Sequence, residues 1–486
     1  MMIGKNKLGR RCFLRLAGAA GTVLLAACGA PAAPTPAPAS SAAQAAPTTA
    51  PAAVAANPVV ATKPAVAPPA ASAAKPASKS TVLFWYQTVT AQYEEPVRKI
   101  IRDEFNEANK DRIEMTFEYI ADWDRVNRTA VAAGAAADII FSNGPTLAIQ
   151  YAQANQLVPL DGYSADFKWK QNMFDWAYLQ GTYEGKLISL QQSVETMCLY
   201  YNKTMFAKNG WKVPTNGDEY TVLGKEMQKA NIIPFAHGNF AAHWLSVAYN
   251  NYAGATNMYN ALLGKKKWTD PEFVESIQYF KNLHDTKFMT DGKSIALTSI
   301  EARPLFYSQK AAMMWQGTWT LAPLFAPSPE FEWDWAPIGG LSKYQPTNPY
   351  MAGSGGAYSM VKTAKFQDAA AQVLNWFYSD RKRSVRLAVA QPGEFVAPLR
   401  FEASDFPSTI DPRHRGLMNV LAPATDEKTY GFHVIANFPV KTLTMMQQRW
   451  PDVLLGVVTP TEFQKLTNDL FEQELDAKQV PALAPR

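Results

Sequence analysis

The chain has 486 residues, of which 47% are hydrophobic and 12% aromatic, enough to build a sizeable folded core. Its formal net charge of +5 arises at the start of the chain, because residues 1–80 contain eight basic residues and no acidic one. From Thr81 onward 39 basic residues stand against 42 acidic ones, and this slightly acidic body argues against nucleic acid or an anionic membrane surface as a partner.

Residues 1–27 are predicted to be a signal peptide. Five basic residues precede an apolar run at 16–27 that is too short to span a membrane. Arg10 and Arg11 resemble the pair of a twin-arginine export signal, although Gly9 stands where Ser or Thr is usual. Both twin-arginine export and the general secretion route therefore stay open.

The signal peptide ends in Leu-Ala-Ala-Cys-Gly at 25–29, which resembles a bacterial lipobox. This motif predicts lipidation of Cys28 and a protein anchored to the membrane through acyl chains. The alternative is a cysteine placed by chance in an apolar signal peptide. With Cys12 removed and Cys28 lipidated, Cys198 has no partner, so we expect it to be buried and predict neither a disulfide nor a metal site built on cysteine.

Residues 28–80 are predicted to be the lipidated cysteine and a disordered tether. The segment after Cys28 is rich in Ala and Pro and contains no aromatic residue, Leu or Ile. Such a composition cannot bury enough apolar surface to offset the entropy lost on ordering.

The remaining body of about 400 residues is too long for one core, so we expect two lobes. Its pattern alternates strands and helices, which predicts an α/β fold with a mostly parallel sheet. The expected strands lie at 81–86, 113–119 and 137–141, and the expected helices at 97–108, 122–134 and 369–377. Ligands of such sheets bind at the carboxyl ends of the strands.

Five segments then match, in order, motifs of the family 1 extracellular solute-binding proteins, to which maltose-binding protein belongs. The segment 132–140 resembles "A-A-G-x-x-P-D-I", 156–161 resembles "G-x-L-x-P-L-D", and 183–190 resembles "G-K-x-Y-G-x-P". The segment 199–206 is close to "Y-Y-N-K-x-x-F", and 306–319 resembles "F-x-x-G-K-A-A-M…G-x-W". Departures are Ala137 for the usual Pro, a missing Pro after 183–190, and Gln309 for Gly.

The resemblance implies two α/β lobes, type II in arrangement, joined by crossing strands and closing on a ligand. By analogy one lobe holds 81–193 and 354–399, and the other 194–350 and 400–486. It also implies a substrate-binding component of an ABC importer that is a monomer, takes a small carbohydrate and delivers it to a permease, in the periplasm or at the cell surface. Neither a cofactor nor a metal is predicted.

A neutral sugar needs side chains with paired donors or acceptors and aromatic rings to stack on. The resemblance places a carboxylate that contacts sugar at Glu195 and an aromatic ring that stacks on sugar at Trp319. An exposed loop glutamate and a core tryptophan are the alternatives for these two positions. Trp315 is expected to lie in the core, because it extends the apolar run 311–314.

Two further groups are candidate ligand contacts because they follow predicted strands. Ser142 and Asn143 come after the strand ending at Phe141, where small polar residues make a maltodextrin ligand doubtful. Trp85 and Gln87 share one face at the end of the first strand, which could also be a core face. Trp244 and Ser354 are weaker candidates.

An enzyme is not predicted, because the sequence lacks the metalloprotease, esterase and P-loop motifs. A glycosidase would be recognised only by two carboxylates close in space. The open alternatives are a binding protein of the same fold for a peptide, a polyamine or another small solute, and a surface hydrolase or adhesin. Several carboxylates converging with aromatic rings would favour a polyamine.

Overall fold

The computed structural model describes residues 79–89, 91–325 and 330–486. The chain divides into two units, Met1–Ala73 and Ala74–Arg486, and every described residue belongs to the second. The predicted signal peptide, Cys28 and all but the last two residues of the predicted tether lie outside the described residues. Along these residues, no helix has both the length and the apolarity needed to cross a membrane.

The first sheet contains the three strands predicted from the start of the body, and all three are confirmed. Its order is β2 (Ile113–Ile120), β1 (Ser80–Gln87), β3 (Ile139–Ser142), β12 (Ala357–Met360) and β6 (Leu190–Gln191). β1 is parallel to both β2 and β3, as predicted, and β12 pairs antiparallel with β3 and β6. The parallel strands place their carboxyl ends at one edge of the sheet, which is the edge that carries the site.

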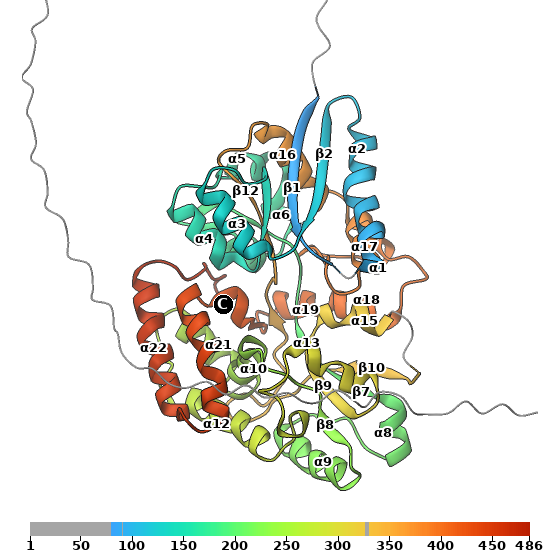
Figure 1. The fold of residues 1–486 in the computed structure, drawn as a ribbon, viewed down its shortest axis with the longest axis vertical. Coiled ribbons are helices and arrows are strands. Elements are labelled where there is room, and N and C mark those ends of the chain that lie inside the picture. Colours follow the sequence, from blue (N-terminus) through green and yellow to red (C-terminus); the bar gives the residue numbers. More distant parts are fainter. Residues whose placement is uncertain (1–78, 90, 326–329) are drawn as a thin grey trace, which may run out of the picture. The chain divides into compact units, whose positions relative to one another are not determined.

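Helices flank this sheet (Figure 1). The predicted helix 97–108 is one continuous helical stretch with a π-helical turn in its middle: α1 (Ala91–Arg98), η1 (Lys99–Asp103) and α2 (Glu104–Ala108). Val97, Ile101 and Phe105 bury its apolar face. The other two predicted helices are confirmed as α3 (Trp123–Ala132) and α16 (Gln367–Trp376). The remaining helices around this sheet include α4 (Pro145–Gln153), α5 (Asp161–Phe167), α7 (Asp175–Gln180) and α17 (Arg381–Ala390).

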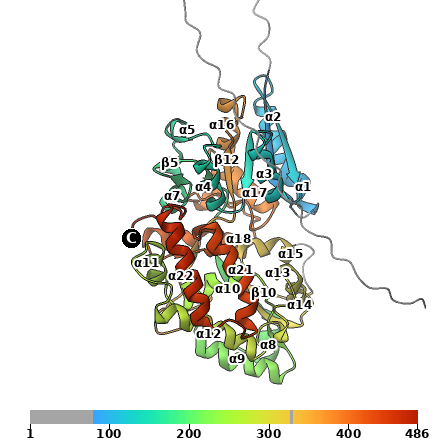
Figure 2. The same cartoon turned by 60° about the vertical axis from the view of Figure 1, so that its left-hand side comes forward.

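The second sheet has the order β10 (Trp333–Ala336), β7 (Met197–Asn202), β9 (Ala311–Gly317) and β8 (Ile233–Phe235). It differs from the expectation of a mostly parallel sheet, because β7 runs against both of its neighbours and only β8 and β9 are parallel. Buried Cys198 lies on β7, as predicted. The helices of this half include α8 (Lys203–Asn209), α9 (Gly217–Lys229), α10 (Ala241–Val247), α12 (Pro271–Asp285), α21 (Val440–Leu454) and α22 (Pro460–Asp476) (Figures 1 and 2).

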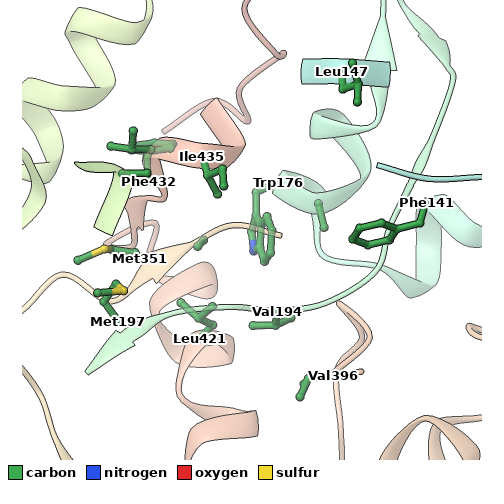
Figure 3. Packing of buried hydrophobic residues seen from close by; sticks show 14 of the residues in the cluster. Phe141, Leu147, Trp176, Val194, Met197, Met351, Val396, Leu421, Phe432 and Ile435 are labelled. Carbon is green, nitrogen blue, oxygen red and sulfur yellow. The ribbon is translucent and has the colours of Figure 1, made fainter. Parts of the chain in front are cut away.

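The chain passes between the two sheets in the segments 192–196, 353–356 and 391–399. The first two are paired, because Glu195 N donates to Gly353 O at 2.9 Å and Gln192 N donates to Gly356 O at 2.9 Å. The third joins them through Val194 N, which donates to Val396 O at 2.6 Å. At these segments Val194, Val396 and Leu421 belong to the cluster of buried hydrophobic side chains (Figure 3). The predicted lobe boundaries near 194 and 354 fall in these crossings and stay a prediction.

A glycine is required at position 356 by close packing. A Cβ atom there would overlap the side-chain oxygen of Gln192 and the ring of Phe141. We therefore expect Gly356→Ala to lower the free energy of unfolding by about 1–3 kcal/mol, as overpacked cores do. Urea unfolding checks this value.

The matched control is Gly162→Ala in α5, where nothing lies within 4 Å of the added Cβ. Alanine inside a helix should leave stability unchanged or raise it by about 0.5–1 kcal/mol. Equal stabilities of the two variants would contradict the packing of the crossing segments described above.

Candidate functional site

A cavity of about 320 Å³ lies between the two sheets and is lined by Gln87 at the end of β1 and by residues of the loops and helices around both sheets. A hollow of about 620 Å³ at the α8–α9 surface is larger. The cavity between the sheets is the better candidate, because buried imidazole nitrogens of His243 and His433 that line it have no hydrogen-bond partner in the described part of the chain. Unsatisfied buried polar groups are costly, and a polar ligand in this cavity would supply the partners that these nitrogens lack.

The first sheet contributes residues from the ends of its parallel strands, where such folds bind ligands. Gln87 ends β1 and Asn143 follows β3, and both line the cavity, while their contact with a ligand stays a prediction. Ser142 is buried instead, and its hydroxyl donates to Gly144 O at 3.2 Å. Trp85 also lies outside the lining; its Nε1 donates to Glu118 of the neighbouring strand at 3.0 Å.

Glu195 lies in the first crossing segment and lines the cavity with only 6% of its surface exposed. Its Oε1 accepts a hydrogen bond from the Ser193 hydroxyl at 3.0 Å, and a side chain at position 355 would overlap its carboxyl group. Burial, and next the nearby charge of Glu394, raise the pKa of Glu195 to about 8. At neutral pH this carboxyl therefore keeps its proton and can both donate and accept.

A second carboxyl, Glu394, lines the same cavity from the third crossing segment. Burial raises the pKa of Glu394 to about 7, against the opposing effect of the Arg303 charge. Arg303 lies between α13 (Ser299–Ala302) and α14 (Pro304–Tyr307), and its Nε is buried without a partner among the described residues. Sequence reasoning missed both residues, since neither stands in a recognisable motif.

Trp319 supplies the aromatic surface. It lies in the 3₁₀ turn η4 (Thr318–Thr320) directly after β9, and its ring packs over Gly317, where any Cβ would overlap it. The ring is only partly buried, lines the cavity, and lies 4.8 Å from the His243 ring at an interplanar angle of 31°. An aromatic ring held in this way can stack on an apolar ligand face.

Two histidines that no sequence motif indicates, His243 and His433, also line the cavity. Burial lowers the pKa of His433 to about 4, and burial together with the neighbouring His433 and Arg303 charges lowers that of His243 well below its usual range. Both rings are therefore uncharged at neutral pH. Both ring nitrogens of His433, and Nδ1 of His243, have no hydrogen-bond partner within the described residues. Each ring can serve a ligand hydroxyl as donor or acceptor.

The structure does not bring Trp244 or Ser354 to the lining. Trp244 is fully buried in α10, where Nε1 donates to Gly238 O at 2.9 Å and the ring packs on His237. The Ser354 hydroxyl accepts from Ser193 N at 3.3 Å and also bonds Gly356, so it supports the crossing segments. Trp315 is buried, as predicted.

Comparison with known proteins places this site in context. The family model for bacterial extracellular solute-binding protein matches residues 89–383, more than half of the chain. The chain belongs to this family. The resemblance drawn from its motifs is therefore confirmed, and the family is one of binding proteins. Within the described residues no cluster of three His, Cys, Asp or Glu side chains is placed to hold a metal ion.

Curated relatives match over parts of their length. The diacetylchitobiose-binding protein NgcE of Streptomyces coelicolor is 29% identical over 29% of this chain and 31% of its own length. A multiple sugar-binding protein of Streptococcus mutans is 25% identical over 54% of this chain and 63% of its own length. The matched part of the chain thus spans about a third of the length of the first relative and just under two thirds of the length of the second.

Solved structures share the two-lobed fold. A chain from work on xylan utilization by Caldanaerobius polysaccharolyticus superimposes with a TM-score of 0.68 at 21% identity, covering 80% of this chain and 99% of its own. The GacH receptor of Streptomyces glaucescens gives 0.65 at 19% identity, covering 82% and 99%. At these identities the likeness establishes the fold alone.

The raised pKa of Glu195 makes stability depend on pH. Between the ordinary value of 4.5 and about 8, the unfolded chain releases a proton that the folded chain keeps. The free energy of unfolding should therefore fall as pH rises across this interval. In Glu195→Gln the side chain is neutral in both the folded and the unfolded state. The free energy of unfolding of this variant should therefore fall less with rising pH than that of the unchanged protein, as measured by urea unfolding at several pH values.

Glu226→Gln, at an exposed position of α9, is the matched control and should follow the unchanged protein. A Glu195→Gln variant with the same pH profile as the unchanged protein would show that Glu195 is not a buried, protonated group.

Proposed function

We propose that the protein captures a carbohydrate in the cavity between its lobes and delivers it to the permease of an ABC importer. The observation that carries this proposal is the meeting of one partly exposed tryptophan, Trp319, with two carboxyl groups, Glu195 and Glu394, and with Arg303 in one cavity. A sugar offers an apolar C–H face for stacking and hydroxyl groups for hydrogen bonds, and this set of side chains serves both.

The electrostatics of the cavity favour a neutral ligand. Burial keeps Glu195 protonated at neutral pH, Glu394 titrates near neutrality with Arg303 beside it, and both imidazoles are uncharged. A polyamine would need several ionised carboxylates, and the Arg303 guanidinium would repel it. The relatives named for diacetylchitobiose and multiple sugars support the same choice.

The fold supports a mechanism without covalent chemistry. We propose that the lobes hold 81–193 with 354–399 and 194–350 with 400–486, and that they close over the ligand about the crossing segments. Closure surrounds the sugar with groups from both lobes, and a permease then recognises the closed form. The protein acts as a monomer held outside the cytoplasm by a lipid on Cys28.

A second candidate function is hydrolysis, because Glu195 and Glu394 line one cavity and both have raised pKa values. Glycosidases use two carboxyl groups in this way. Incubation of the protein with oligosaccharides separates the two functions: binding without release of shorter sugars supports capture, and turnover supports hydrolysis. The family match favours capture.

Trp319→Ala should weaken carbohydrate binding by about tenfold or more, because it removes the stacking surface, a loss of about 1.4 kcal/mol. The ligand is first found by a thermal-shift screen of sugars, peptides and polyamines, in which about 2.7 kcal/mol of stabilisation is expected at a hundredfold excess over Kd. Titration calorimetry then gives the Kd of each variant.

Trp85→Ala is the matched control, since Trp85 is partly buried but lies outside the cavity. Its Kd should equal that of the unchanged protein. A thermal shift with peptides or polyamines and none with sugars would overturn the carbohydrate proposal, and an unchanged Kd in Trp319→Ala would remove Trp319 from the site.

The anchor proposal rests on the lipobox at 25–29. Cys28→Ala should release the protein from membranes, because the lipobox then has no thiol to carry the acyl chains. Fractionation of expressing cells measures this, with Cys198→Ala as the control that should stay in the membrane fraction. A Cys28→Ala protein that stays membrane-bound would indicate an uncleaved signal helix instead.

A further inference from the structure

The residues after α22, 477–486, run along the boundary between the two predicted lobes (Figures 1 and 2). α22 belongs to the lobe that holds 400–486, yet the residues that follow it are bonded to the other lobe. Their partners there are Gln153, the last residue of α4, and Glu184, in the turn between β4 (Thr182–Tyr183) and β5 (Lys186–Leu187). We call residues 477–486 the strap.

Gln153 bonds the strap with both ends of its amide group. Its Nε2 donates to Ala477 O at 3.2 Å, and its Oε1 accepts from Gln479 Nε2 at 3.2 Å. The same Nε2 also donates to the Tyr183 hydroxyl at 3.3 Å, a bond within one lobe that orients the amide group. Gln153 therefore ties two residues of the strap to α4.

An ion pair adds to these bonds. Lys478 Nζ lies 3.2 Å from Glu184 Oε1, and 73% and 55% of the two side chains are exposed. A pair as exposed as this is weak by itself and is screened by salt. The strap therefore holds the other lobe through the sum of its contacts, of which the ion pair is the one that depends on salt.

The strap cannot follow the lobe to which it is bonded, because both of its ends belong to the opposite lobe. Its start continues α22. At its end the Arg486 guanidinium lies over the rings of Tyr259, Tyr430 and Phe432, at 5.1, 5.1 and 4.7 Å from their centroids, which are favourable cation–π distances. All three rings belong to the predicted lobe that contains α22. A rotation that separates the lobes therefore also separates 477–479 from Gln153 and Glu184.

We propose that the strap holds the two lobes in the arrangement of the structure, so that their movement about the crossing segments must break its bonds to Gln153 and Glu184. This inference rests on the lobe movement of the proposed function and adds the segment that opposes it. In this arrangement one cavity is lined from both lobes, by Asn143 of one and Trp319 of the other. Stabilising the arrangement raises the fraction of the protein that is competent to bind, and the apparent affinity follows that fraction.

The test is the distribution of distances between the lobes in the full chain without ligand. Spin labels are attached through non-natural amino acids at two exposed positions, Asp166 of α5 and Lys225 of α9, and double electron–electron resonance measures their separation. Gln153→Ala and Lys478→Gln should each lower the population at the distance of the structure, relative to other distances, by about two- to fivefold. This is the change expected for the loss of one or two exposed polar contacts. The double variant should lower the population further.

Lys465→Gln is the matched control, because Lys465 forms its exposed ion pair, at 2.6 Å, with Asp469 inside α22 alone. It should leave the distribution unchanged. At about 1 M salt the effect of Lys478→Gln should disappear while that of Gln153→Ala remains, since only the ion pair is screened. An unchanged distribution in Gln153→Ala and in the double variant would overturn the strap. Because the distances are measured without ligand, a failure of sugar binding would contradict the proposed function and leave this result standing.

Discussion

The structure depends on the packing of the three crossing segments, 192–196, 353–356 and 391–399, around Glu195. A carboxyl group is buried there against the backbone of Gly355, bonded to Ser193, and close enough to Glu394 to feel its charge. Any side chain at 355 would displace that carboxyl group, and any side chain at 356 would displace Gln192. The glycines at 355 and 356 therefore serve close packing between crossings rather than left-handed backbone geometry. The same packing that joins the sheets also fixes polar groups at the floor of the cavity.

Joining the sheets at this point determines what the cavity can hold. Burial suppresses charge on Glu195 and on both histidines, so the walls present hydrogen-bonding groups with little net charge. Several buried polar atoms, on His433, His243 and Arg303, have no partner in the described part of the chain, a cost that a ligand rich in hydroxyl groups would remove. Trp319, in the turn directly after β9, adds an apolar ring face on which a sugar ring can stack.

The sequence predicts those parts of the molecule that follow local periodicity. The strands β1 and β3 are apolar runs of strand length, and β2 alternates apolar with polar residues. The carboxyl-end rule for parallel sheets points to Gln87 and Asn143, which line the cavity. Arg303, Glu394 and His433 could not be found in this way, since they come from separate loops and meet only through tertiary packing. The same limit applies to Trp244, which follows Ala-Ala-His, and to Trp319, which follows Gly-Thr: only the fold buries the first fully and leaves the second partly exposed.

A crystal structure of the protein with the carbohydrate that binds most tightly tests the central claim most directly. The account predicts a sugar ring against Trp319, with its hydroxyl groups bonded to Glu195, Glu394 or His433, in the cavity between the two sheets. A sugar bound elsewhere on the surface, or a cavity filled by a charged solute that pairs with ionised Glu195, would contradict it.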